Sequence, residues 1–198
     1  LAHKPKAKIW FYDDESQIYV NGNGLRKNLL EQIRNIGLSR YEEKAISISN
    51  TTFCITDEET NYLKSLGFYS TRTLPYPIDD GYYHYNWKLP KDEFSVLFVG
   101  DYSHYPNKEA AKIICTKIHP ALKGLKIKFI LVGRNLNRIK KYLNDEISVF
   151  ENVDDIRPFY WKSTLFIAPL FSGGGMRIKI LEAAACGIPI LMTPTANI

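Results

Sequence analysis

Short apolar segments alternate with amphipathic segments through the second half of the chain. Apolar runs lie at 95–99, 126–132, 147–150, 165–168 and 188–192, with helical patterns between them at 107–118, 136–143, 154–161 and 175–186. Parallel strands need a crossover connection, usually a helix, and strands covered on both faces show continuous apolar runs. The alternation therefore predicts an α/β domain in which helices cover both faces of a parallel sheet.

Glycines and polar residues follow several of these strands directly. In such sheets, ligands bind beyond the carboxyl ends of the strands. Gly100, Gly133, Arg134 and Val153 all lie at these ends, so we take them as candidate binding residues.

The most specific pattern is the glycine-rich segment that opens the last helix. Gly173, Gly174 and Gly175 allow a tight turn and close approach of a ligand to the backbone. The unpaired N–H groups and dipole of a helix start attract an anion. Cations in the first turn, Arg177 and Lys179, oppose that dipole unless an anion is bound there.

A carboxylate completes this pattern. For a helix starting at Gly175, Glu182 lies about 10 Å along the axis at ~1.5 Å per residue. This is roughly the distance from a diphosphate to the ribose of the same nucleotide, and a carboxylate can accept hydrogen bonds from ribose hydroxyls. The pattern therefore predicts a nucleoside diphosphate lying along one helix. The alternative is a flexible loop followed by a surface ion pair between Lys179 and Glu182.

The first half of the chain predicts part of another α/β domain. Strands are expected at 8–12, 52–55 and 72–74, and amphipathic helices at 25–36 and 40–48. A capping box, Thr56-x-x-Glu59, starts a further helix that Gly67 ends. Residues 75–90 are rich in proline and tyrosine and show no period. We therefore divide the chain into a domain at 1–80, a linker at 81–93 and a second domain at 94–198.

Composition narrows the class of protein. The 198 residues carry a net charge of +5, but no arginine-rich stripe with interleaved aromatics, so a nucleic-acid partner is not expected. Three distant cysteines favour a reducing compartment without disulfides or a zinc site. No apolar run reaches membrane-span length, and no signal peptide is visible. The chain lacks an initial Met and stops after an apolar strand, so we expect a piece of a longer cytoplasmic protein.

The order of these motifs resembles the group 1 retaining glycosyltransferases (family 4, GT-B fold). The resemblance is carried by Leu97–Gly100 with Pro106-Asn107, Ile130–Arg134, Asn152–Pro158, Ala168-Pro169 and Gly173–Pro189. It implies two Rossmann-like domains. The first would bind the acceptor and is only partly present; the second would bind a nucleotide sugar and is truncated at its C-terminus.

The resemblance also implies roles for single residues. Glu182 matches the ribose-binding second glutamate of the family's glutamate–seven residues–glutamate motif, whereas Gly174 replaces the first glutamate. That change is typical of a glycine-rich Arg-x-Lys subgroup, and it removes the usual contact to the donor sugar. Arg177 and Lys179 would supply the catalytic charge on the diphosphate. Asp13 stands near the position of a family histidine, and Asp13 and His104 are candidate acceptor or sugar contacts.

The implied reaction is sugar transfer from a nucleoside diphosphate sugar, without a metal or other cofactor. The implied acceptor is a polysaccharide, lipopolysaccharide or glycolipid. Because most relatives act at the inner face of a membrane, and the net charge is positive, we expect a cytoplasmic protein with peripheral contact to anionic lipid.

Three alternatives remain. A sugar-nucleotide epimerase would share the GT-B fold, because fold alone does not determine function. A non-catalytic nucleotide-sugar-binding relative would explain Gly174. A receiver-like phosphoacceptor domain at 1–75 would use Asp13, Asp14 and Asp57 to hold Mg²⁺, although Asp57 lies in the capping box, where an acidic residue simply favours the helix start.

Overall fold

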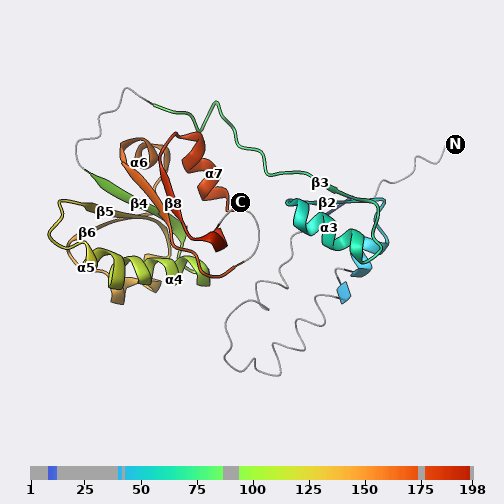
Figure 1. Ribbon diagram of the computed structural model, residues 1–198, viewed down its shortest axis with the longest axis horizontal. Helices are drawn as coiled ribbons and strands as arrows, with labels where there is room; N and C mark the ends of the chain where they lie inside the picture. The colour runs from blue at the N-terminus through green and yellow to red at the C-terminus, as the bar shows by residue number, and fades with distance from the viewer. Residues whose placement is uncertain (1–8, 13–39, 42, 87–93, 174–176, 197–198) are drawn as a thin grey trace, which may run out of the picture. The chain divides into compact units, whose positions relative to one another are not determined.

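Strands form two separate parallel sheets in the computed structural model (Figure 1). The structure describes residues 9–12, 40–41, 43–86, 94–173 and 177–196. By its internal contacts the chain divides into two compact units, one made mainly of residues 1–77 and the other of residues 78–172 with 177–198.

The second unit contains a five-stranded sheet in the order β6-β5-β4-β7-β8, with every neighbouring pair parallel. Its strands are β4 (Ser95–Asp101), β5 (Lys128–Arg134), β6 (Ile147–Glu151), β7 (Leu165–Ala168) and β8 (Ile190–Met192). The chain starts at the central strand, moves outward to β6 and then returns past β4 to β7. The strand order therefore reverses beside β4, which is where ligands bind in open α/β sheets.

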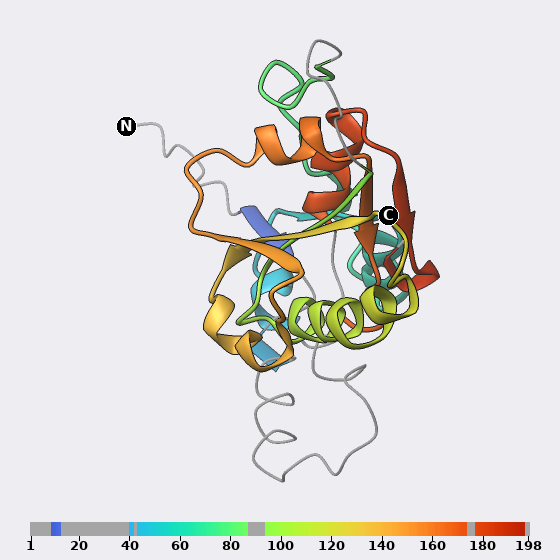
Figure 2. The same ribbon diagram turned by 90° about the vertical axis from the view of Figure 1, so that its left-hand side faces the viewer.

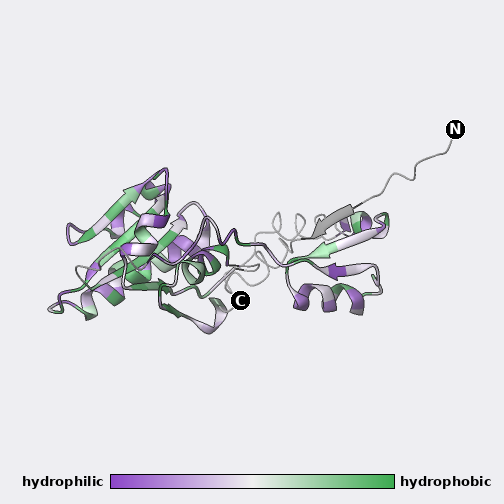
Figure 3. Cartoon of the chain, turned by 90° about the horizontal axis from the view of Figure 1, so that it is seen from above, coloured by the Kyte–Doolittle hydropathy of each residue, from purple (hydrophilic) through white to green (hydrophobic). Residues whose placement is uncertain are grey.

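Helices cover both faces of this sheet, as the alternation predicted. The elements α4 (Tyr105–Ile113) and α5 (His119–Ala121) lie on one face, and α6 (Arg157–Lys162) and α7 (Ile178–Ala185) on the other (Figures 1 and 2). The middle of β4 and of β5 is apolar, and polar residues stand at the ends of both strands (Figure 3). Leu97, Phe98 and Val132 are almost fully buried; burial of side chains of this size contributes about 1.5–3 kcal/mol each.

Several helix boundaries differ from the sequence prediction. The helix expected at 107–118 contains a π-helical turn at Ile114–Ile118, and the helix expected at 136–143 is two 3-10 turns, Leu136–Arg138 and Lys140–Tyr142. Leu136 and Ile139 are buried three residues apart, a spacing that matches the three-residue 3-10 repeat.

The other two helices begin three residues later than predicted. The carboxylate of Asp155 accepts a hydrogen bond from the backbone N–H of Arg157 and thereby sets the start of α6. Arg177 is the N-cap of α7, which starts at Ile178 rather than Gly175.

The first unit has a three-stranded parallel sheet in the order β1-β2-β3. Its elements are β1 (Ile9–Tyr12), β2 (Thr51–Cys54), α3 (Asp57–Ser65) and β3 (Thr71–Thr73), with a helical stretch at 40–41 and 43–47. Thr56 and Glu59 form the predicted capping box. The helix predicted at 25–36 lies outside the described residues.

Asp57 belongs to α3 and does not end a strand. Its side chain accepts a hydrogen bond from the hydroxyl of Thr73, and it stands with two further acidic residues in the first helical turn. Acidic residues stabilise this end of a helix, so the position of Asp57 is explained by the helix start and not by a phosphoacceptor role.

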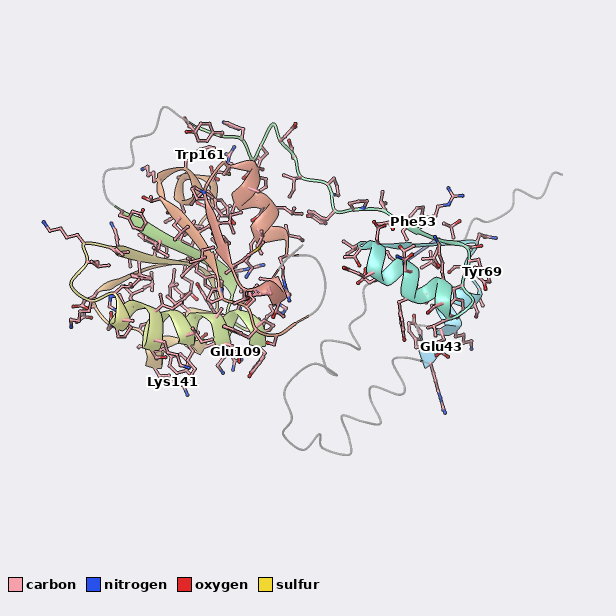
Figure 4. The ribbon with its side chains drawn as sticks, in the orientation of Figure 1. Glu43, Phe53, Tyr69, Glu109, Lys141 and Trp161 are labelled. Carbon is pink, nitrogen blue, oxygen red and sulfur yellow. The ribbon has the colours of Figure 1, made fainter. Side chains whose placement is uncertain are left out.

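Part of the predicted linker belongs structurally to the second unit. Trp161 of α6 donates a hydrogen bond from its indole Nε1 to the backbone carbonyl of His84 at 2.7 Å (Trp161 is labelled in Figure 4). A Cβ atom on Gly187, just after α7, would lie 2.5 Å from the ring of Tyr85. Residues 82–86 therefore pack on this unit, whose separation from the first unit falls between Pro77 and Ile78.

Within the described part of the chain, no helix combines the length and apolar character needed to cross a membrane.

The contact between β4 and β5 leads to a first prediction. A Cβ atom on Gly133 would lie 1.7 Å from the carbonyl oxygen of Gly100, so Gly133→Ala must move the backbone of one strand. We expect a loss of about 3 kcal/mol in the free energy of unfolding, at the upper end for overpacking. Urea denaturation measures this loss.

Gly124→Ala is the matched control. Gly124 has a φ of +103° and no atom within 4 Å of a built Cβ, so its substitution adds only backbone strain, about 1 kcal/mol. Equal losses in the two variants would show that the close approach of the strands does not limit stability.

Candidate functional site

A hollow lies at the carboxyl ends of β4, β5 and β6 within the second unit. Two charged side chains of α7 reach it, Lys179 and Glu182. The remaining lining residues end β4 and β5, follow β6 or precede α6: Val99, Gly100, Asp101, Val132, Gly133, Arg134, Asn152, Val153 and Ile156. The hollow thus lies beside the reversal of strand order, where the sequence placed its candidate residues.

Two glycines form the floor of the hollow. Gly100 and Gly133 are paired in the register of β4 and β5, close enough that Gly133 has no room for a Cβ atom. A Cβ atom on Gly100 would lie 2.9 Å from Cγ of Asn107, at the start of α4. The absence of side chains here lets the Asn107 amide reach the end of β4.

Asn107 connects that strand end to Lys179. Its Nδ2 donates a hydrogen bond to the carbonyl of Asp101 at 2.8 Å, and its Oδ1 accepts one from the ammonium of Lys179. The Lys179 Nζ also lies 4.8 Å from the centroid of the Phe98 ring. Asn107 and the aromatic ring together hold the lysine near the carboxyl end of β4.

The charge on Lys179 is costly in this structure. Burial lowers the pKa of Lys179 to about 7, with a further lowering by nearby Arg177 and a smaller opposing effect of Glu182. An ammonium that is partly desolvated and close to another cation is stabilised by a bound anion. The site is therefore suited to a negatively charged group.

The carboxylate of Glu182 has different neighbours. Tyr83 donates a hydrogen bond to Oε1 at 2.8 Å and Tyr160 donates one to Oε2 at 2.9 Å. Burial is the main cause that raises the pKa of both phenols, and their contact with Glu182 raises it further. Since Lys179 binds Asn107 and Glu182 binds tyrosines, the structure does not support the simple surface ion pair considered from the sequence.

Asp101 forms a second polar group at the rim. Hydrogen bonds from the hydroxyl and backbone N–H of Ser103 lower the pKa of Asp101 to about 2, and Asn135 donates to it at 2.8 Å. Arg134, which is largely exposed, has its Nε 3.8 Å from the same carboxylate.

The start of α7 differs in detail from the sequence model. Arg177 precedes the helix and Lys179 is its second residue, so both cations stand at its amino end, as predicted. The guanidinium of Arg177 donates to the carbonyl of Ser172 at 3.2 Å, and Arg177 does not line the hollow. Because the helix starts later, Glu182 lies only ~7.5 Å along the axis from Arg177 rather than 10 Å.

The structure brings together six of the predicted site residues: Gly100, Gly133, Arg134, Val153, Lys179 and Glu182. His104 is exposed at the N-cap of α4 and is not part of the lining. Gly173 has a φ of +94°, typical of a glycine turn, but does not line the hollow either. Asp13, Gly174 and Gly175 lie outside the described residues.

Asn107, Tyr83 and Tyr160 were not predicted to take part. The sequence around Asn107 could have indicated a site residue, because Asn107 follows a strand that ends in glycine and a proline at a helix start. Tyr83 is 99 residues from its partner Glu182, and no local pattern reveals such a contact.

Among the described residues, no group of three or more His, Cys, Asp or Glu side chains is placed to hold a metal ion. The three cysteines, Cys54, Cys115 and Cys186, are buried free thiols.

The strand order and the helices on both faces define a doubly wound α/β domain, and the hollow lies at its switch point. A family model described as "Glycosyl transferases group 1" matches residues 93–198, which is more than half of the chain. The chain belongs to this family. No curated protein sequence gave a significant match.

Solved structures with the same fold are GT-B glycosyltransferases. WaaG, a glycosyltransferase involved in lipopolysaccharide biosynthesis, has a TM-score of 0.68 at 15% identity over 95% of this chain and 56% of its own. Alr3699/HepE of Anabaena, solved with UDP-glucose, has a TM-score of 0.65 at 14% identity over 93% of this chain and 52% of its own. The GtfA/B complex has a TM-score of 0.58 at 15% identity, with 79% of this chain and 32% of that chain covered. The chain thus spans between about a third and somewhat over half of these structures.

The pKa of Lys179 leads to a second prediction. Below pH 7 the native state and the unfolded state both hold the proton, and the native state bears the full cost of the buried charge. Between pH 7 and the ordinary lysine value the native state releases the proton first, so the free energy of unfolding rises with pH. The slope contributed by one group is at most about 1.4 kcal/mol per pH unit.

Lys179→Met removes this contribution while other titrating groups remain. We expect the variant to unfold at a higher temperature than the parent at pH 6.5, and this advantage to shrink steadily toward pH 10. Thermal denaturation at a series of pH values measures the difference. A difference that does not vary with pH would show that the Lys179 amine titrates as an ordinary lysine.

Proposed function

We propose that the hollow binds a nucleoside diphosphate sugar and that the full protein is a retaining glycosyltransferase. The observation that carries this proposal is the placement of Lys179 and Glu182 on one helix, α7. Both side chains line the hollow at the carboxyl ends of β4 and β5, where Gly100 and Gly133 lie. A cation at the helix start and a carboxylate one turn later match the diphosphate and ribose of a single nucleotide. Solved relatives of the same fold contain UDP-glucose or UDP.

In this proposal the diphosphate lies at the amino end of α7. The first backbone N–H groups of a helix lack intrahelical partners and, with the helix dipole, attract an anion. Lys179 stands among them and gains its full charge when the diphosphate binds. Arg177 adds positive potential from the N-cap position. The ribose hydroxyls then donate to Glu182, and Val153 and Ile156 offer apolar surface to the base.

The chemical role of these groups is to stabilise the leaving diphosphate. Cleavage of the bond between the sugar and the phosphate leaves negative charge on the diphosphate, and groups already aimed at that position lower the barrier. The acceptor hydroxyl forms the new bond on the same face of the sugar and passes its proton to the departing phosphate oxygen. This route requires neither a protein nucleophile nor a metal, so we propose that no cofactor is used.

The acceptor follows from family resemblance and not from the geometry of the hollow. WaaG acts in lipopolysaccharide biosynthesis, and we propose a polysaccharide, lipopolysaccharide or glycolipid acceptor for this protein as well. The net charge of +5 suits peripheral contact with an anionic membrane surface on the cytoplasmic side. Gly174 in place of a family glutamate means that other residues must contact the donor sugar.

A thermal-shift titration with UDP, GDP, dTDP and ADP tests donor binding. A ligand specific to the folded state adds about 2.7 kcal/mol at a hundredfold excess over its dissociation constant. We expect one nucleotide to raise the unfolding temperature of the parent, because the site selects one base. We expect Glu182→Ala to abolish most of that rise, because the ribose loses its acceptor.

Glu146→Ala is the matched control, since Glu146 is an exposed carboxylate of the same unit that does not line the hollow. It should retain the full shift. If none of the four nucleotides stabilised the parent, the nucleotide-binding proposal would fail. With a bound nucleotide, turnover of donor alone would favour an epimerase, and binding without turnover in the full-length protein would favour a non-catalytic relative.

A further inference from the structure

Residues 82–85 contact α6 and α7, the two helices beside the hollow. The guanidinium of Arg157 lies 3.8 Å from the centroid of the Tyr82 ring, and it donates three hydrogen bonds to the carboxylate of Asp155. Trp161 binds the carbonyl of His84. These contacts place a segment from the expected linker firmly on α6.

Tyr83 stands in the middle of this stretch and turns its hydroxyl to Glu182. Together with Tyr160 it occupies one acceptor site on each oxygen of the carboxylate, at 2.8 Å and 2.9 Å. A carboxylate has about four acceptor sites. Among the described residues, no other donor bonds this carboxylate, so one site on each oxygen is open to a donor. This is the arrangement needed to accept from two neighbouring hydroxyls.

The side from which the two phenols reach the Glu182 carboxylate supports this use of its remaining acceptor sites. Glu182 lines the hollow, whereas neither tyrosine is among its lining residues. The phenols thus bind the carboxylate without contributing to the wall of the hollow. Glutamate has several rotatable bonds, and fixing such a side chain before a ligand binds removes an entropic cost from binding.

The two phenols also keep their protons. Burial, followed by the contact with Glu182, raises the pKa of Tyr83 and of Tyr160 well above the neutral range. Both groups are therefore donors throughout the neutral pH range.

We propose that Tyr83 and Tyr160 are positioning residues that hold the Glu182 carboxylate with one free acceptor site of each oxygen directed at the ribose diol of the nucleotide. This inference rests on the proposed nucleotide-binding function and adds to it two residues outside the glycosyltransferase motifs. The segment that leads into the second unit thereby helps to build that unit's binding site.

Calorimetric titration with nucleotides that have and lack the ribose hydroxyls tests the proposal. The probes are UDP, GDP and ADP and their 2′,3′-dideoxy counterparts, and the comparison uses the base that binds. Tyr83→Phe keeps the ring and removes only the hydroxyl. We expect this variant to bind the ribonucleotide about three- to tenfold more weakly, a part of the strength of a hydrogen bond to a charged group. Its affinity for the dideoxy nucleotide should be unchanged.

Two further variants make the test specific. In a Glu182→Ala background, Tyr83→Phe should have no further effect on ribonucleotide binding, because the group that it positions is absent. Tyr82→Phe is the matched control: it keeps the ring that contacts Arg157 and should bind as the parent does. Thermal unfolding of each variant without nucleotide measures any loss of stability separately from the loss of affinity.

Each other outcome overturns the inference. If Tyr83→Phe weakened both nucleotides equally, the tyrosine would support the fold and not the carboxylate. Tyr83→Phe could also leave the affinity for both nucleotides unchanged while Glu182→Ala weakens ribonucleotide binding. Nucleotide binding would then stand, and the positioning role of Tyr83 would be wrong. If a nucleotide bound to the parent and Glu182→Ala had no effect, the ribose contact and the positioning role would both be wrong, while nucleotide binding would stand. If no nucleotide bound to the parent, both proposals would be wrong.

Discussion

The close approach of Gly100 and Gly133 is the constraint on which the rest of the site depends. With no Cβ atom between them, β4 and β5 stay in register to their carboxyl ends. At this end of the sheet, the two glycines present no side chain to the hollow. The same lack of a side chain at Gly100 gives Asn107 room to bond the end of β4 and to accept from Lys179. The two glycines therefore set both the shape of the hollow and the position of its cation.

Opposite charges on α7 then give the hollow its polarity. Lys179 is kept in a partly desolvated position where an anion restores its charge, and Glu182 is held by two neutral phenols that leave acceptor capacity free. Such an arrangement lowers the stability of the empty protein, because a desolvated cation is expensive. A local cost to stability is typical of functional sites, where ligand binding offsets it.

Much of this arrangement could be predicted from local sequence. Alternating apolar and amphipathic segments predicted the parallel sheet with helices on both faces, and glycines after the strands predicted the edge at which the hollow lies. The start of α7 was placed three residues early, since a glycine run does not mark where helical hydrogen bonding begins. Tyr83 and Tyr160 could not be predicted, because their contacts with Glu182 depend on packing between distant segments. The same is true of the contact that leaves no room for a Cβ atom on Gly133.

The most direct test of this account is a crystal structure of the chain with its preferred nucleoside diphosphate. The account predicts both ribose hydroxyls within about 3.2 Å of the Glu182 carboxylate. It also predicts the diphosphate beside the Lys179 ammonium at the start of α7, with Tyr83 and Tyr160 still bound to Glu182. A nucleotide bound elsewhere on the second unit, or one whose ribose turns away from Glu182, would contradict it.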